Sequence, residues 1–546
     1  MAKAQRPEIT TLTATQLDQL LAEVRPLVPA ATYQLIAALL QTLQWIMAAF
    51  EQKTLSIARL KRMLFGHSTE TTAKVLSSQP GTDPASVKAP GQPKAKRQGH
   101  GRNGAQDYPG ARKVKVPHAT FKVGQLCPQC LRAKLYLLKT PARLVRIVAQ
   151  PLFQATVYEL ERLRCALCGA VFTAPAPPQA GTSKYDPSVG TMLAIMRYGA
   201  GQPMYRMDKW QTHFGVPLPA STQWELIQAA SATPALVYDA LIGVGAQGRL
   251  LHHDDTTMRV HSLRQQLTQA PPPPEGQKRT GIFTTSIVSQ VGPHPVALFF
   301  TGEKHAGENL DQLLRRRAAG LDKPLQMCDG LSRNRSKEFE TILCNCILHG
   351  RRMFVEVVDD FPEECRFVVE SLRDVYRVDA QAKEQKLSDA ARLALHQEHS
   401  RPVMDTLHAW MNAQFEQRKV EPNSGLGQAI TYMLKRWEPL TRFLEVPGAP
   451  LDNNLSERAL KMAILHRRNS MSYKTLNGAR VGDVFMSLIH TSQLNRVNPF
   501  EYLLALQEHS QDVAKDVGRW LPWNFTEAQP SELRASVLPL CRTHAT

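Results

Sequence analysis

PLDNNLSERALKMAILHRR, residues Pro450 to Arg468, is the stretch around which this chain is organised. Its polar start and the apolar residues that follow at a 3.6-residue period predict a loop that opens a helix, with Asn454 as the N-cap. Glu457 then occupies the third helical position, where a carboxylate accepts a hydrogen bond from the N-cap backbone N–H. Lys461, four residues further on, is in place to form an ion pair with Glu457. Within this segment, helix capping is a sufficient explanation for Glu457.

The chain is long and strongly basic. Its 546 residues exceed what one hydrophobic core normally serves and allow several domains. Lysine and arginine total 66 against 48 aspartates and glutamates, a formal net charge of +18. This excess favours a polyanionic partner, nucleic acid before membrane. Residues 31–50 are uncharged but contain three glutamines and lack a basic flank, so no membrane span is expected there.

The N-terminal segment carries a heptad pattern. Apolar residues recur at alternating three- and four-residue spacings between Ile36 and Leu64, with Lys53 as the one polar position in the series. This a/d pattern predicts a coiled coil, in which Lys53 would set the register. We therefore expect residues 1–70 to form a helical, zipper-like segment. An amphipathic helix packed on its own domain is the alternative.

Residues 71–118 form a compositional break. Ser, Pro, Gly, Ala, Gln and Lys dominate, no apolar periodicity survives, and a flexible basic linker is predicted. A solvated tether is the default interpretation of its charge, whereas an arm that binds DNA phosphates is the functional one. The second interpretation would use Lys96, Arg97 and Arg102.

Two cysteine pairs, Cys127-Pro-Gln-Cys130 and Cys165-Ala-Leu-Cys168, are the strongest local signal. Each pair can point two thiolates at one tetrahedral ion, so residues 119–176 predict a module with a structural four-cysteine zinc site. The strand-like alternation between the pairs predicts a hairpin that would bring them together. A redox or iron–sulfur role is the alternative. The nine cysteines, without a recognisable secretory signal, favour a reducing cytosol over a disulfide framework.

Residues 177–248 predict helices at Pro187–Tyr198, at Tyr205–Phe214 and, as one long helix capped by Ser221, after Pro219. The last two have the size and the Gly-containing turn of a helix-turn-helix. Helix pairs of this kind are common, so DNA contact and simple packing both remain open.

The pattern changes to strands at Arg249. An apolar run ends on Asp254 and Asp255, an antiparallel pair follows around a proline-rich insertion at residues 271–274, and a helix at Glu308–Ala319 leads to a strand that ends at Asp329. This order is the layout of a ribonuclease H-like core. In that fold Asp254 and Asp329 would stand on adjacent central strands.

A further motif follows at Cys346-Ile-Leu-His349-Gly-Arg351-Arg352. Cys346 and His349 suggest a metal pair, but only two soft ligands are visible. A buried strand-to-helix packing element with phosphate-facing Arg351 and Arg352 is therefore the favoured interpretation.

These motifs together resemble those of the insertion sequence 66 (IS66) family of transposases, bacterial enzymes of the DDE class. The resemblance is carried by four motifs, namely DD-T at Asp254, MCDG around Asp329, C-x-x-H-x-R-R at Cys346 and DNN-L-x-E-R-A at Asp452. An FG-x-x-S/T-E ending after the heptads and GHGR in the linker also match. Asp255 replaces the usual glutamate, which leaves open which acid ligates metal, and Ile347 and Leu348 depart from the common Trp and Ala.

The resemblance implies an active site of Asp254, Asp329 and Glu457 that holds a pair of Mg²⁺ ions, or Mn²⁺ in their place. By analogy Asp254 would bridge the ions while Asp329 and Glu457 flank them. Phosphate contacts would come from basic residues near this centre and in the linker, namely Arg351, Arg352, Arg458, Lys461, Arg467, Arg468, Lys96, Arg97 and Arg102.

The expected fold class is a multidomain α+β protein. The zipper segment, linker, zinc module and helix-turn-helix-like region precede a ribonuclease H-like catalytic domain at residues 249–490, with a helical insertion at about 361–449 and a C-terminal tail at 491–546. The expected partner is double-stranded DNA, bound by a homo-oligomer in the bacterial cytoplasm at the nucleoid. Small companion proteins of the same element are left open.

Three functions can be compared on these residues. The first is a transposase that cuts and joins DNA at element ends, and the second is a non-catalytic DNA-binding or assembly protein derived from one. The presence of Asp254, Asp329 and Glu457 together favours the enzyme. A simple metal nuclease would leave the N-terminal architecture unexplained.

Overall fold

The structure is a computed structural model. It describes residues 114–138, 142, 152–168, 170–269 and 281–528, together with isolated positions between Leu21 and Gln34. The heptads from Ile36 to Leu64, the proline insertion, and Lys96, Arg97 and Arg102 lie outside the described residues. The chain divides into two compact units, Met1–Pro80 and Gly81–Thr546, and the second contains every strand and helix named below.

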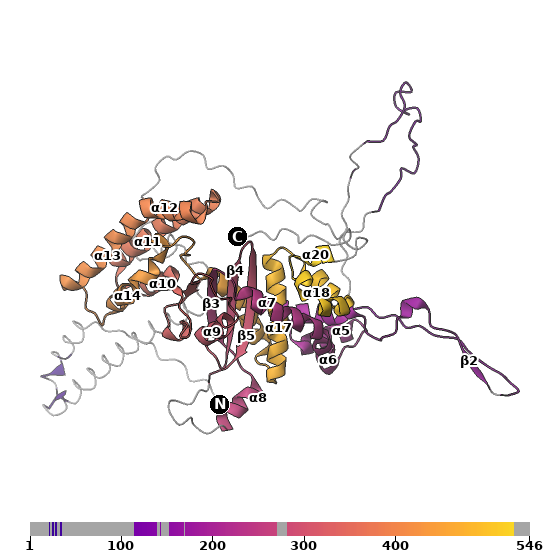
Figure 1. The fold of residues 1–546 in the computed structure, drawn as a ribbon, viewed down its shortest axis with the longest axis horizontal. Helices are drawn as coiled ribbons and strands as arrows, with labels where there is room; N and C mark the ends of the chain where they lie inside the picture. The colour runs from indigo at the N-terminus through magenta and orange to yellow at the C-terminus, as the bar shows by residue number, and fades with distance from the viewer. Residues whose placement is uncertain are drawn as a thin grey trace. The chain divides into compact units, whose positions relative to one another are not determined.

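A five-stranded mixed sheet forms the centre of the second unit (Figure 1), with strand order β5-β4-β3-β6-β7. Three strands form an antiparallel meander, namely β3 (Leu250–Thr257), β4 (Phe283–Val291) and β5 (His294–Gly302). The last two run parallel to β3, namely β6 (Leu325–Cys328) and β7 (Ile342–Asn345). The predicted antiparallel pair and the adjacency of the strands that carry Asp254 and Asp329 are confirmed. β7 leads through Cys346 into a helix, which agrees with the strand-to-helix element expected there, although its four residues are too short for their bounds to be predicted.

Helices cover both faces of this sheet, which explains why β4 is buried along most of its length instead of alternating with polar residues. On one face, Ser289 Oγ donates to the carbonyl of Gly245 in α7 (Ala232–Gly245), and Asn309 of α9 (Ala306–Leu314) donates to Thr285 Oγ1. On the other face, Ser286 contacts Ser456 of α16 (Asn454–Ser470). The alternation of strand side chains assigns the odd-numbered residues of β4 to the first face and the even-numbered ones to the second.

The free edge of β5 is closed by a helix instead of another strand. Three α17 (Leu476–Leu494) side chains at four-residue spacing accept hydrogen bonds from alternate backbone N–H groups of β5. These pairs are Thr301 to Asp483 at 2.7 Å, Phe299 to Ser487 at 2.9 Å, and Ala297 to Thr491 at 3.0 Å. These backbone N–H groups of the edge strand are therefore satisfied, so β5 is protected from pairing with a strand of another chain.

The helices before the sheet are α4 (Pro187–Ala194), the π-helical turn η3 (Ile195–Gly199), α5 (Met204–His213) and α6 (Ala220–Ala230). The first two predicted helices are confirmed. The single long helix expected after Pro219 is wrong, because the chain breaks at Ser231 and continues as α7. Ser221 is not the N-cap, since Pro219 holds that position. A short helix not predicted from sequence, α8 (His261–Gln269), follows β3.

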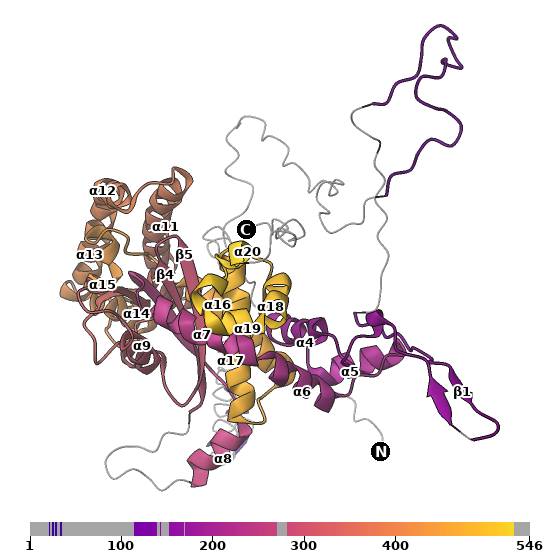
Figure 2. The same ribbon diagram turned by 45° about the vertical axis from the view of Figure 1, so that its right-hand side comes forward.

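Packed helices fill residues 362–444, where a helical insertion is expected at about 361–449, and several of them are labelled in Figure 2. They are α11 (Pro362–Glu384), α12 (Asp389–His399), α13 (Arg401–Glu416), α14 (Gly425–Leu434), α15 (Trp437–Leu440) and η5 (Arg442–Leu444), and α10 (Ile347–Glu356) precedes them. The buried Asp379 carboxylate joins them through Lys383 at 2.7 Å and Arg392 at 2.8 Å. Arg392 also donates to the carbonyl of Ala449, and so ties the insertion to the loop before α16.

Residues after 491 fold onto the core and do not form the expected tail, as far as residue 528. Their elements are α18 (Pro499–Glu508), α19 (Ser510–Lys515), η6 (Val517–Trp520) and α20 (Phe525–Ala528). Tyr502, Trp520 and Phe525 are buried in the same hydrophobic core as α4, α7 and β5. The reason is that these apolar side chains cover surface that α4 and α17 leave exposed.

The remaining elements are short. β1 (Arg162–Arg164) and β2 (Val171–Thr173) pair antiparallel near the second cysteine pair, and η2 (Pro178–Ala180) and η4 (Ser332–Asn334) are single turns. Among the described residues no single helix is long and apolar enough to cross a membrane. Helices α6 and α7 reach that length and apolar character only when they are taken together, and the chain bends between them.

The edge contact of α17 generates a pH-dependent stability. Burial raises the pKa of Asp483 to about 7, although Thr301 donates two hydrogen bonds to it. This pKa is higher than that of an aspartate in the unfolded chain. The folded protein therefore resists ionisation of Asp483, and its free energy of unfolding falls as pH rises from 4 towards 7. Asp483→Asn keeps an acceptor for Thr301 and should be increasingly more stable than wild type over that range, by up to about 4 kcal/mol at pH 8.

Thermal unfolding of both proteins at pH 4, 6 and 8 measures this difference. Ser487→Ala removes a neighbouring, uncharged edge contact, so its difference from wild type should not depend on pH. A difference between Asp483→Asn and wild type that stays constant with pH would contradict the raised pKa.

Candidate active site

The register of the sheet brings Asp254 and Asp329 together. β3 and β6 are parallel, with Leu250 opposite Leu325 and His252 opposite Met327. Two residues further along the same register, Asp254 of β3 lies beside Asp329, which directly follows the carboxyl end of β6. β6 pairs in parallel with β7, with Cys328 opposite Asn345. In the same register Cys346, the residue after β7, lies beside Asp329.

Asn453 docks the start of α16 onto this end of the sheet. It is fully buried, its Nδ2 donates to the carbonyl of His253 at 2.9 Å, and its Oδ1 lies 3.3 Å from Nδ1 of His252. Its backbone N–H donates to Cys346 Sγ at 3.4 Å. One asparagine thus joins the loop before α16 to β3 and to the residue after β7.

This docking also corrects the predicted helix start. The N-cap is Asn453, not Asn454, and its side chain turns to the sheet instead of capping the helix. Glu457 is therefore the fourth helical residue, so the predicted capping box is not formed. Asp452 instead accepts a hydrogen bond from the Asn454 backbone N–H at 3.1 Å. The capping explanation for Glu457 is wrong, because the helix begins one residue earlier than expected and Glu457 lies one position beyond the third helical residue.

The neighbouring residue Ser456 sets the orientation of Glu457. Ser456 is fully buried and its Oγ lies 2.6 Å from Ser286 Oγ of β4, which is the strand partner of Asp254. Glu457, the next residue, is partly exposed and turns towards His349, with Oε1 4.0 Å from Nε2. The Glu457 carboxylate is also close enough to Asp254 to act on its charge.

The carboxylates repel one another electrostatically. Burial raises the pKa of Asp254 to about 7, and the negative charges of Asp329, Asp255 and Glu457 add to this effect. The backbone N–H of Asp255, which donates to Asp254 Oδ1 at 2.8 Å, only partly opposes it. A partly buried acid beside other acids is an arrangement that a bound cation would stabilise.

Asp329 is oriented by its own loop and by the helical insertion. Its Oδ1 accepts hydrogen bonds from Asn334 Nδ2 at 2.7 Å and from the backbone N–H of Leu331 at 3.1 Å. The next residue, Gly330, lies so close to α14 that a Cβ there would meet Arg436 at 2.3 Å. The glycine of the MCDG motif therefore allows the insertion to pack against the site, and Arg436 Nε donates to its carbonyl.

Asp255 points to the opposite face of the sheet. Its Oδ2 accepts from the backbone N–H of Ala306 at 3.3 Å and lies 3.1 Å from His305 Nδ1, at the start of α9. Arg333 lies 3.6 Å from its other oxygen. Asp255 is thus held by positive partners away from Asp329, and Asp254 is the acid that faces Asp329 and Glu457.

The predicted phosphate-binding residues within the described part of the chain differ in exposure and contacts. On α16, Arg458, Lys461 and Arg468 are exposed along one side of the helix that begins at the carboxylates. Arg467 instead donates to the hydroxyls of Thr256 and Thr257 at the end of β3. On α10, Arg352 is exposed.

Arg351 is 9% exposed, so the expectation that it faces phosphate is at odds with the structure. A four-residue motif does not reveal which of two adjacent arginines lies on the buried side of its helix.

Sequence reasoning missed one grouping. Ligand atoms of Cys346, His349 and Glu457 lie within 4.8 Å of one another, the only such group of three His, Cys, Asp or Glu residues in the described part of the chain. The sequence showed Cys346 and His349 as a pair. The third member comes from a helix more than a hundred residues later, and no local spacing could identify it.

The two cysteine pairs form separate tight turns. The Cys127 backbone N–H donates to the carbonyl of Ala133 at 2.7 Å, and that of Cys165 donates to Ala170 at 2.9 Å. Backbone N–H groups of Arg132 and Ala133 that point at its sulfur lower the pKa of the Cys130 thiol. Most residues between the pairs lie outside the described part of the chain, so the four-cysteine zinc site stays a prediction.

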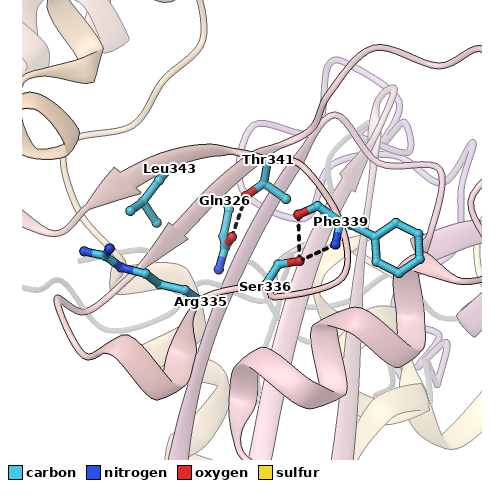
Figure 3. Close-up of a pocket in the computed structure, with 6 residues that line it drawn as sticks. All are labelled: Gln326, Arg335, Ser336, Phe339, Thr341 and Leu343. Carbon is cyan, nitrogen blue, oxygen red and sulfur yellow. Dashed lines mark hydrogen bonds between the residues drawn. The ribbon is translucent and has the colours of Figure 1, made fainter.

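A small pocket of about 190 Å³ lies beside β6, away from the carboxylates. Figure 3 shows Gln326 hydrogen-bonded to Thr341, and Ser336 bonded to the backbone of Phe339, which together close its wall. None of the predicted site residues lines it, and the carboxylate centre itself is open to solvent at Glu457.

Comparison with known proteins agrees with the motifs. The model of the family described as "Transposase IS66 family" matches residues 182–481, more than half of the chain. The chain is also similar to two proteins of Sinorhizobium fredii (strain NBRC 101917 / NGR234). Uncharacterized protein y4hP is 26% identical over 67% of this chain and 67% of its own length, and uncharacterized protein y4jD is 27% identical over 67% and 72%, respectively.

The docking role of Asn453 can be tested against its neighbour. Asn453→Ala leaves the buried carbonyl of His253 without its donor and should lower the free energy of unfolding by about 2–4 kcal/mol. Asn454→Ala removes a side chain that makes no hydrogen bond in the described part of the chain, and should stay within about 0.5 kcal/mol of wild type. Urea unfolding followed by circular dichroism compares the two, and equal losses would refute the docking role.

Proposed function

The chain belongs to the IS66 transposase family, and we propose that it is a DNA transposase that binds the ends of an insertion element and catalyses metal-dependent strand cleavage and strand transfer. The observation that carries the proposal is the convergence of Asp254, Asp329 and Glu457. They come from two adjacent strands and from a helix that docks across them. The strand order, with a three-strand meander followed by two parallel strands, supports a ribonuclease H-like core for residues 249–490.

The donor set fits Mg²⁺. Three carboxylates offer the hard oxygen ligands that this ion prefers. Burial is the main cause of the raised pKa of Asp254, the neighbouring carboxylates add to it, and no described basic residue forms an ion pair with Asp254. When bound, a metal pair activates the attacking oxygen and stabilises the leaving one. Asn334 and Leu331 would keep the bonded oxygen of Asp329 in place, while Asn453 and Ser456 hold the helix start that presents Glu457.

The exposed cations of α16 would bind the DNA backbone. Arg458, Lys461 and Arg468 extend along the helix from Glu457, so a strand bound to them is led to the carboxylates. Arg467, by contrast, would shape the end of β3 through its two threonine contacts. Because Lys and Arg contacts to phosphate release counterions, we expect binding to weaken steeply with salt.

Transposition also implies an assembly. Two element ends must be held together, so we propose a homo-oligomer in which the predicted coiled coil of residues 1–70 takes part, acting on chromosomal DNA in the cytoplasm. We further propose that Cys127, Cys130, Cys165 and Cys168 hold a structural zinc ion. The N–H groups directed at Cys130 support this, because such donors stabilise a metal-bound thiolate.

The triad can be tested by single isosteric changes. Glu457→Gln, Asp254→Asn and Asp329→Asn should each lower Mg²⁺-dependent cleavage and joining by at least about 10³-fold. Electrostatic stabilisation by the metal is worth several kcal/mol, and about 1.4 kcal/mol is tenfold in rate. DNA binding by each variant should keep the salt dependence of wild type. The measurement is strand transfer of labelled DNA that flanks this reading frame, together with binding isotherms at several salt concentrations.

Asp255→Asn is the matched control, since it changes the adjacent acid on the opposite face and should retain most activity in folded protein. Near-normal joining by Glu457→Gln would overturn the catalytic assignment. DNA binding without any cleavage by wild type would favour a non-catalytic protein derived from a transposase.

The zinc site has its own test. Purified protein should contain one tightly bound zinc per chain, and Cys127→Ser and Cys165→Ser should both lose it and weaken DNA binding, because such small modules depend on the ion for folding. Elemental analysis measures the content. Zinc-free protein, or a Cys165→Ser variant with full zinc, would refute the site.

A further inference from the structure

Cys346, His349 and Glu457 form a mixed sulfur, nitrogen and oxygen cluster at the edge of the carboxylate centre. Cys346 is the N-cap of α10, His349 lies in the first turn of the same helix, and Glu457 lies in the first turn of α16. Their ligand atoms lie within 4.8 Å of one another. The helix starts that present them are joined, because the backbone N–H of Ile347 donates to the carbonyl of Leu451 at 3.0 Å.

The polar atoms of this cluster are poorly satisfied. His349 Nδ1 is buried without a hydrogen-bond partner in the described part of the chain, and Nε2 lies 4.0 Å from Glu457 Oε1, beyond hydrogen-bonding distance. A buried ring nitrogen without a partner is costly, so its retention needs an explanation. A cation between Nε2 and the Glu457 carboxylate would link these two groups, which no hydrogen bond joins, and Nδ1 would keep its proton on the other side of the ring.

Burial raises the pKa of the Cys346 thiol to about 12, and hydrogen bonds from the backbone N–H groups of Asn453 and His349 oppose this increase. Cys346 is fully buried, and its Sγ accepts a hydrogen bond from the Asn453 backbone N–H at 3.4 Å. A donor to a thiolate sulfur is the outer-shell contact typical of metal sites. Glu457 and His349 are each partly exposed, with side chains 32% and 26% accessible, so an ion can enter from the solvent side.

The three ligand types select a cation other than Mg²⁺. Thiolate and imidazole suit Zn²⁺ and similar borderline ions, whereas Mg²⁺ prefers an all-oxygen set. One Cys, one His and one carboxylate leave a coordination position open, as in zinc sites that keep a water. On binding, the thiol proton would be released to solvent as the metal–sulfur bond forms.

We propose that Cys346, His349 and Glu457 bind one Zn²⁺-like divalent cation, and that this cation withdraws Glu457 from the Mg²⁺ centre and so inhibits DNA cleavage. The binding half of the proposal stands on the cluster alone. The inhibitory half rests on the proposed function, because it requires Glu457 to act in catalysis.

The binding half is tested with Co²⁺ as a spectroscopic probe on the full-length protein, dialysed so that it retains only its tightly bound zinc. Wild type should show a thiolate-to-cobalt charge-transfer absorption, seen as the difference from Cys346→Ser, which lacks the sulfur ligand. His349→Gln should weaken cobalt binding by at least about tenfold. Cys365→Ser, which alters a buried thiol outside the cluster, should retain the wild-type spectrum. The site would be overturned if the cobalt spectrum of wild type were identical to that of Cys346→Ser and the cobalt affinity of His349→Gln were unchanged. Two variants are used so that poor folding of one does not decide the result.

The inhibitory half is tested by adding micromolar Zn²⁺ to Mg²⁺-dependent cleavage, each variant being compared with its own zinc-free rate. Zinc should inhibit wild type, excess Mg²⁺ should relieve the inhibition, and His349→Gln should require at least about tenfold more zinc. Equal zinc sensitivity of wild type and His349→Gln would overturn the shared use of Glu457. Wild type that binds cobalt through Cys346 but cleaves no DNA would instead refute the proposed function and leave the cation site intact.

Discussion

The contact between Asn453 and the end of β3 is the interaction on which the candidate site depends. Without it, the loop before α16 would have no polar anchor in the apolar interface between helix and sheet. The hydrogen bonds to His253 and towards His252 fix the height of the helix start along β3, and the Ser456 contact with Ser286 fixes its rotation. Burial keeps both histidines neutral by lowering their pKa values, to about 4 for His252 and about 3 for His253. They can therefore serve as uncharged partners in the interior.

The same docking holds negative charge in an unfavourable place. Asp254 is largely buried and faces Asp329 and Glu457, so its carboxyl group resists ionisation. The opposite face shows the contrast, because Asp255 has His305, Arg333 and a helix N-terminus as partners. Two adjacent aspartates thus have different chemistry, set by the alternation of a strand. An acid whose charge is balanced by protein groups stabilises the fold, whereas one whose charge is not balanced is suited to bind a cation.

The helical insertion contributes to the site through backbone contacts. Arg436, the N-cap of α15, reaches Gly330 beside Asp329, and Arg392 of α12 holds Ala449 ahead of α16. Both arginines donate to carbonyl groups in the loops that carry candidate ligands. A long insertion between Asp329 and Glu457 is therefore compatible with a precise site, because it is fastened to the loops on both sides. Its internal cohesion depends on Asp379, whose pKa Lys383, Arg392 and His396 hold below its ordinary value despite burial.

Local sequence determined much of this protein. Strand periodicity, the acids at strand ends and the DNN motif sufficed to place Asp254 and Asp329 on neighbouring strands and Glu457 near the start of a helix. These predictions succeeded because each depends on a short repeat or on residues within one turn. The family resemblance extended them to a function, which the match over residues 182–481 supports at the level of the family.

Only the tertiary structure decided which side chains meet. It moved the N-cap from the expected Asn454 to Asn453 and anchored that residue on the sheet, buried Arg351, broke the helix after Pro219 and folded residues 499–528 onto the core. It also added Glu457 to Cys346 and His349. Each outcome depends on which face of an element packs against a partner distant in sequence. Periodicity within a segment defines the faces of a helix or strand, but the partner that covers each face is chosen by the packing of the whole chain.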